Sequence, residues 1–162
     1  MSDKQEVDMN EIHTNLAKQL FNSAWDFMEK EDRTAADDDT MIHTTHASRY
    51  HWEQVGEPVN LARGEWQVSR VYTVLNRSEP ATYHAQRCLD ICQENNIADW
   101  DLAFAYESLA RAWSLTDNTQ ERDRFLSLAI QACDQVADAE DRKYVMNDLK
   151  TIPGFADLVA DS

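Results

Sequence analysis

Glycine and proline are rare in this chain, and their scarcity limits the folds that it can adopt. Only 3 Gly and 3 Pro occur among the 162 residues. A sheet protein of this length needs many tight turns, which these two residue types commonly form. No stretch of the sequence alternates apolar and polar residues in the manner of a half-buried strand. The sequence therefore predicts an all-α protein.

Apolar residues recur at helical spacing through most of the chain, and polar breaks divide this pattern into about seven helices. The predicted helices cover residues 8–30, 37–55, 58–75, 78–95, 99–116, 119–136 and 140–150. Because the turns between them are short, neighbouring helices are expected to pack antiparallel. We predict one domain over residues 1–162, a right-handed stack of antiparallel helical hairpins. Residues 1–7 are predicted to be disordered, and residues 140–162 to form a capping helix and tail.

The charge balance narrows the possible partners. The chain has 30 acidic and 15 basic residues, a net charge of -15. Such a surface repels nucleic-acid phosphates and anionic membranes, so we expect neither as a partner. It keeps the protein soluble and also suits a basic protein partner. The first residues lack the apolar core of a signal peptide, and no apolar run is long enough to span a bilayer. The 3 Cys are an odd number, which does not suggest the disulfide framework of a secreted protein. These features predict a cytoplasmic protein.

Residues of the same class recur at an offset of 41 positions. Trp25 and Trp66 are separated by this distance, as are Arg70 and Arg111, and Leu61 stands 41 residues before a further leucine. A fixed offset of this kind indicates repeated hairpins.

The stretch from residue 69 to residue 88 resembles a tetratricopeptide repeat. Ser69 is followed three residues later by Tyr72 on a first helix, and small residues follow on the second helix; Ala110, Trp113 and Ala129 continue the pattern. The resemblance implies stacked helical hairpins that recognise a peptide. Residues 46–56, 64–72 and 101–107 also resemble a group of bacterial proteins of undetermined activity, and this second likeness implies no activity.

Several arginines fall on predicted first helices, which line the inner surface of a hairpin stack. We predict a concave groove there, and a guanidinium in it can bind a carboxylate or phosphate through two hydrogen bonds. Internal ion pairs with Glu65, Glu107 or Asp101 are an open alternative for the same arginines. The groove candidates are Arg63, Trp66, Arg70, Glu107 and Arg111.

The second predicted helix is rich in histidine and poor in aliphatic residues. Asp39, His43 and His46 are spaced by four and three residues, which places them on one helical face. A carboxylate and two imidazoles on one face can share a divalent metal ion or act in acid–base chemistry. The alternative is that the histidines form hydrogen bonds across a helix interface or face water.

The tryptophans are predicted to divide between core and surface. Trp25, Trp66 and Trp113 are expected to fill space between helices, whereas Trp52 and Trp100, near helix ends, are expected to be half exposed.

These observations favour a non-enzymatic binding or scaffold protein without a cofactor. The expected ligand in the groove is a segment of a protein or peptide partner, with a basic partner as one option, or a small anion. The alternative function is a metal-dependent enzyme or sensor built on Asp39, His43 and His46. A third interpretation is a structural homodimer.

Overall fold

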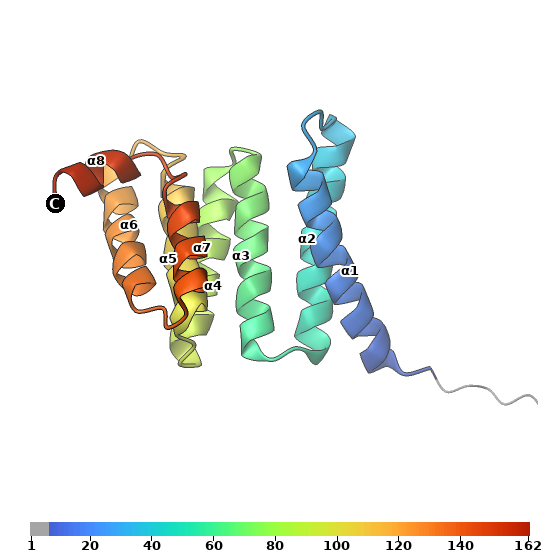
Figure 1. The fold of residues 1–162 in the computed structure, drawn as a ribbon. Coiled ribbons are helices and arrows are strands. Elements are labelled where there is room, and N and C mark those ends of the chain that lie inside the picture. The colour runs from blue at the N-terminus through green and yellow to red at the C-terminus, as the bar shows by residue number, and fades with distance from the viewer. Residues whose placement is uncertain (1–6) are drawn as a thin grey trace, which may run out of the picture.

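The computed structural model describes residues 7–162, and this part of the chain contains helices and no strand. The prediction of an all-α hairpin stack is confirmed (Figure 1). A short eighth helix in the tail exceeds the predicted number of about seven. The predicted disorder of residues 1–7 lies outside the described residues, apart from the exposed Val7. The helices are α1 (Met9–Glu29), α2 (Ala35–Val55), α3 (Pro58–Val74), α4 (Ser78–Glu94), α5 (Asp99–Trp113), α6 (Thr119–Asp134), α7 (Ala139–Leu149) and α8 (Phe155–Ala160).

The helix ends follow from local residue chemistry. Thr34 precedes α2 and its hydroxyl accepts from the backbone N–H of Asp37 (3.2 Å), while the Asp37 carboxylate accepts from the Thr34 N–H (2.9 Å). This reciprocal pair is a capping box. Asn76 ends α3 with a φ of 57°, a conformation that asparagine tolerates better than most residues. Ser78 is the first residue of α4, and Arg77 precedes it at the cap position.

Three hairpins stack along the molecule, α1 with α2, α3 with α4 and α5 with α6. The first helices of the hairpins also contact one another: α1 contacts α3, α3 contacts α5, and α5 contacts α7 (Figure 1). Helices α1, α3, α5 and α7 therefore form one continuous layer, which we call the first-helix layer. Helix α7 occupies the place that the first helix of a fourth hairpin would take.

The main cluster of buried apolar residues lies in the C-terminal two thirds of the molecule. It runs from Ala62 on α3 to Ile152 in the tail, and Phe155 packs against it, so the tail folds back onto the stack. Among residues 7–162, none of the members of this cluster comes from α1 or α2. The first hairpin buries its own small set, including Ala17, Ala24 and Met41. It is therefore attached to the stack without sharing the main core.

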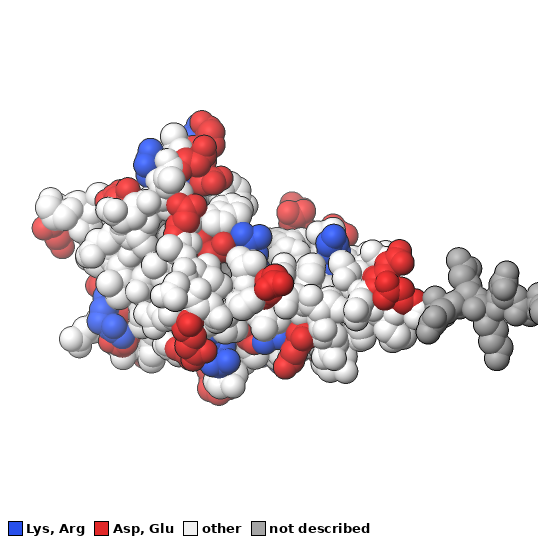
Figure 2. All heavy atoms as spheres, turned by 90° about the horizontal axis from the view of Figure 1, so that it is seen from below, with Lys and Arg blue, Asp and Glu red and all other residues white. Residues whose placement is uncertain are grey.

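Acidic side chains outnumber basic ones on the face shown in Figure 2, as the net charge of -15 requires. No helix in the described part of the chain is both long and apolar enough to span a membrane.

Candidate functional site

A cavity of about 320 Å³ opens on the first-helix layer. All four helices of the layer contribute to its wall, and α4 contributes one residue to its floor. We call it the aromatic cavity, because six of its ten lining residues carry aromatic rings. The lining residues are Phe21, Trp25, Ala62, Arg63, Trp66, Cys88, Trp100, Asp101, Phe104 and Tyr144.

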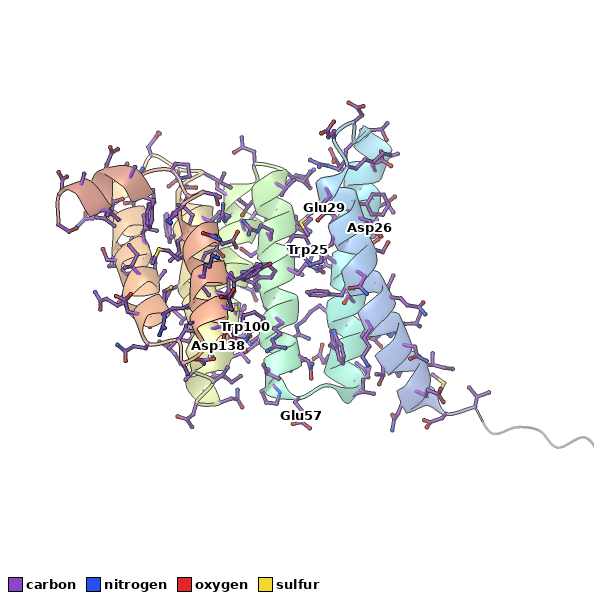
Figure 3. All side chains as sticks on the ribbon, viewed as in Figure 1. Trp25, Asp26, Glu29, Glu57, Trp100 and Asp138 are labelled. Carbon is purple, nitrogen blue, oxygen red and sulfur yellow. The ribbon has the colours of Figure 1, made fainter. Side chains whose placement is uncertain are left out.

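Helical spacing places these rings on the same surface. Phe21 and Trp25 are four residues apart on α1, and Trp100 and Phe104 are four residues apart on α5, so each pair occupies one helix face. Figure 3 labels Trp25 and Trp100, which come from the two helices that flank α3. The buried Ala62 between them is too small to fill the space. The rings therefore border a cavity.

The rings contact one another as a connected series. The Trp25 and Trp66 centroids lie 5.7 Å apart, Trp66 and Phe104 meet edge to face at 5.6 Å, and Phe104 contacts Trp100 at 5.9 Å and Tyr144 at 5.9 Å. Such edge-to-face pairs stabilise each other. Trp25 and Trp66 are half-buried and line the cavity, and Trp66 also packs against the main core as expected. Trp100 is half-buried, as expected. The i, i+4 aromatic pairs were the sequence signal for this site.

Arg63 and Asp101 form an ion pair at the edge of the aromatic cavity. Nε and Nη2 of Arg63 donate to the two carboxylate oxygens of Asp101 at 2.8 and 2.9 Å. The hydrogen bond to Asp101 raises the pKa of Arg63 above its ordinary value. The guanidinium also lies 5.5 Å from the ring centroid of Trp100. The Arg63 charge is therefore balanced within the protein.

A second cavity of about 280 Å³ adjoins the first. It shares Phe21 and Arg63 with the aromatic cavity, and its other lining residues are Lys18, Asn22, Trp52 and Asn60. We call it the polar cavity, because an ammonium, a guanidinium and two amides line it. Asn60 Oδ1 accepts from the Glu57 backbone N–H (2.9 Å). The Nδ2 group at the other end of the amide carries two N–H donors that this hydrogen bond does not use.

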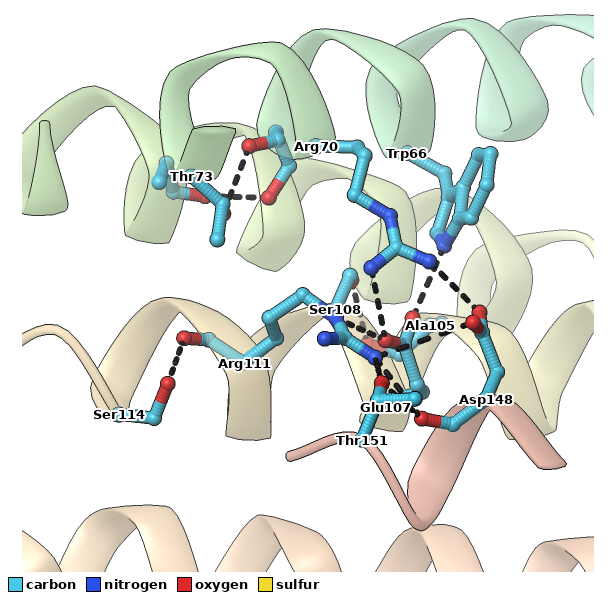
Figure 4. Close-up of polar contacts among 12 residues, drawn as sticks. Trp66, Arg70, Thr73, Ala105, Glu107, Ser108, Arg111, Ser114, Asp148 and Thr151 are labelled. Carbon is cyan, nitrogen blue, oxygen red and sulfur yellow. Dashed lines mark hydrogen bonds and ion pairs between the residues drawn. The ribbon is translucent and has the colours of Figure 1, made fainter. Parts of the chain in front are cut away.

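The remaining groove candidates converge on one buried carboxylate (Figure 4). Glu107 is fully buried, with 0% of its surface exposed. Arg111 Nε donates to its Oε1, Trp66 Nε1 donates to its Oε2 at 3.2 Å, and Arg70 Nη1 lies 3.8 Å from Oε1. Arg70 Nη2 also donates to Asp148 on α7 at 2.7 Å. We call these residues the Glu107 network.

The arginines among the groove candidates form the internal ion pairs that were the alternative to ligand binding, with Glu107 and Asp101 as partners. Arg70 and Arg111 converge beside Trp66, but Arg70 pairs with Glu107 and Asp148, whereas Asp101 pairs with Arg63. The other suggested partner, Glu65, pairs with Arg49 on α2 and His84 on α4. The sequence pattern did not indicate Asp148, because it lies on the capping helix outside the three hairpins.

Asp39, His43 and His46 do not come together as a ligand set. Asp39 and His43 are exposed, whereas His46 is half-buried and its Nε2 lies 2.9 Å from the Tyr72 hydroxyl. In residues 7–162, no three His, Cys, Asp or Glu side chains are grouped so as to hold a metal ion. His46 instead forms the cross-interface hydrogen bond that was the alternative to metal binding.

Comparisons of this chain with protein-family models, with curated proteins and with solved structures find no match.

Proposed function

We propose that the protein is a binding module that takes a large apolar side chain of a peptide segment into the aromatic cavity. A carboxylate of the same segment would lie in the polar cavity. The aromatic cavity is the observation that carries this proposal, because apolar surface that stays in contact with water favours a ligand that covers it.

The shape of the aromatic cavity supports a side chain as its occupant. A volume of about 320 Å³ exceeds that of any single amino-acid side chain and falls at the lower end of the range for small-molecule sites. Aromatic rings bind other rings edge to face as well as by apolar contact. Tryptophan and phenylalanine side chains therefore suit the cavity best.

The charges support a carboxylate beside that side chain, in the polar cavity. The guanidinium groups of Arg70 and Arg111 already pair with Glu107 and Asp148, so the Glu107 network offers an anion no uncompensated charge. Lys18 in the polar cavity is exposed. An ammonium and the Nδ2 group of Asn60 can both donate to a carboxylate.

N-acetyltryptophan and its uncharged amide test both halves of the proposal by isothermal titration calorimetry. At about -0.3 kcal/mol per non-hydrogen atom, N-acetyltryptophan should bind with a dissociation constant of roughly 0.1 mM. N-acetyltryptophanamide should bind about tenfold more weakly, because it lacks the charge-assisted hydrogen bonds. Lys18→Gln should weaken binding of the acid to the level of the amide and leave binding of the amide unchanged.

Lys150→Gln is the matched control, since it removes the same charge from an exposed lysine that lines neither cavity. It should leave both affinities unchanged. Equal affinity for acid and amide would remove the polar cavity from the site, and absence of binding by both probes would refute the proposed function.

A further inference from the structure

The first hairpin docks on the rest of the protein through buried polar contacts as well as the Trp25–Trp66 contact. On its side facing α3, Thr45 donates to the Gln67 side chain (3.1 Å), and Gln67 in turn donates to the backbone oxygen of Phe21 (2.8 Å). Gln67 is fully buried. Polar contacts of this kind contribute little net stability, although each is costly to break without replacement. Polar contacts therefore form part of what holds the hairpin to the stack.

A cluster of titratable groups lies in this interface and joins three helices. Glu65 on α3 accepts from Arg49 on α2 (3.0 Å) and from His84 Nδ1 on α4 (2.6 Å). His46 on α2 contacts Tyr72 on α3, and its ring centroid lies 5.3 Å from that of His84. The two imidazoles therefore meet directly across the boundary between the first and second hairpins.

Apart from its histidines, the cluster pairs one cation, Arg49, with two carboxylates, Glu65 and the more exposed Glu53. Burial would raise the pKa of Glu65, but His84 and Arg49 lower it by more, so Glu65 stays ionised and its charge cancels that of Arg49. The Arg49 Nη1 atom is buried without a hydrogen-bond partner and lies 3.6 Å from Glu53. A proton on His46 would add a positive charge beside the His84 ring and close to the buried Arg49 side chain.

Burial is the main cause that lowers the pKa of His46. Electrostatic interactions with His84 and His43 lower this pKa further, whereas the interaction with Glu65 raises it. Tyr72 on α3 is the remaining group that faces it. A separated hairpin would return His46 to its ordinary pKa of about 6.5. The separated state therefore binds more protons below that pH. The free energy of docking is therefore most favourable above about pH 6.5 and becomes less favourable as the pH falls through this value.

We propose that the α1–α2 hairpin is an acid-released arm, docked on α3 and α4 while His46 is neutral and separated when His46 is protonated. The two-residue connection Gly56–Glu57 between α2 and α3 would act as the hinge. Separation removes Phe21 and Trp25 from the aromatic cavity, and Lys18 and Asn22 from the polar cavity. If the proposed function holds, on which this consequence rests, acid releases the ligand.

Hydrogen exchange measured by mass spectrometry on the full chain without ligand tests the arm directly. Protection factors, corrected for the intrinsic effect of pH, are compared at pH 7.5 and pH 5.5. Protection in α1 and α2 should fall several-fold or more on acidification, since each unit of pKa difference changes the docking equilibrium constant about tenfold. Protection in α5 and α6 should stay constant. No ligand is present, so the result does not depend on whether the cavities bind anything.

Three variants separate the mechanism from general acid sensitivity. His46→Gln should abolish the fall in protection, and His84→Gln should move it to lower pH because the neighbouring charge is lost. His51→Gln is the control, since His51 contacts His13 within the first hairpin and not across the interface (Nδ1 to Nδ1, 2.8 Å). The proposal is overturned if α1–α2 protection is constant with pH, if α5–α6 loses protection in parallel, or if His84→Gln leaves the midpoint unchanged.

Discussion

Replacing Arg111 with alanine should destabilise the protein by about 3–5 kcal/mol. Glu107 is 0% exposed, and Arg111 is the closest cation to its carboxylate. Without that cation, the buried charge keeps only Trp66 and the more distant Arg70 as partners. Arg111 Nη2 also donates to the backbone oxygen of Asp148 (2.9 Å), so its loss loosens α7 as well. Urea unfolding followed by circular dichroism measures the change.

Arg70→Ala should cost less than Arg111→Ala, because Arg70 lies 3.8 Å from Glu107 and its nearer partner Asp148 is partly open to water. Arg124→Ala is the control, since its pair with Glu121 one turn away on α6 is solvent-exposed and should contribute little. If Arg111→Ala and Arg124→Ala have equal, small effects, the Glu107 network does not hold α5, α3 and α7 together.

Trp100→Ala should weaken the binding of N-acetyltryptophan by about 2 kcal/mol, roughly 30-fold, as large aromatic anchors of binding sites do. Its ring contacts Phe104 and Tyr144 and borders the aromatic cavity, so its removal deletes one wall. Calorimetric titration of the variant at a temperature where it is folded measures this loss.

Tyr50→Ala is the control, because it removes an aromatic ring that lines neither cavity. Tyr50 lies on α2 and is 57% exposed. It should leave the affinity unchanged. An affinity of Trp100→Ala within twofold of the native protein would place the probe elsewhere on the surface.

The hairpin stack could be predicted from the sequence because its signals are local. The turn at Asn76 and the cap at Thr34 each depend on residues within one helical turn, and the apolar spacing that marks each helix is equally local. The tail at Phe155 folds back as the apolar residues near the end of the chain indicate, but its short helix was too brief for a periodic signal.

The site was only partly predictable, because it depends on distances between helices. Trp66 and the arginines were expected together, because they fall on predicted first helices and Arg70 and Arg111 are equivalent at the 41-residue offset. Whether Trp25 fills the core or borders a cavity depends on the size of Ala62 across the α1–α3 contact, which no repeat pattern reveals. Likewise, Asp148 reaches Arg70 from 78 residues away in sequence. Long-range pairings of this kind need the packed structure.

The histidines of α2 show the same limit. Their spacing places Asp39, His43 and His46 on one face, but the partners of that face come from α3 and α4. Tyr72 and His84 there make His46 part of a helix interface.

The indole N–H signals in a nitrogen–proton correlation spectrum test the central claim most directly. The chain has five tryptophans, each of which gives one signal that a single Trp→Phe variant assigns. Saturation with N-acetyltryptophanamide should shift the signals of Trp25, Trp66 and Trp100, which line the aromatic cavity, and leave that of Trp113 in place. Trp52, in the polar cavity, should respond less to the amide than to the acid. Unchanged signals for Trp25, Trp66 and Trp100, or a shift of Trp113 as large as theirs, would contradict a ligand site in this cavity.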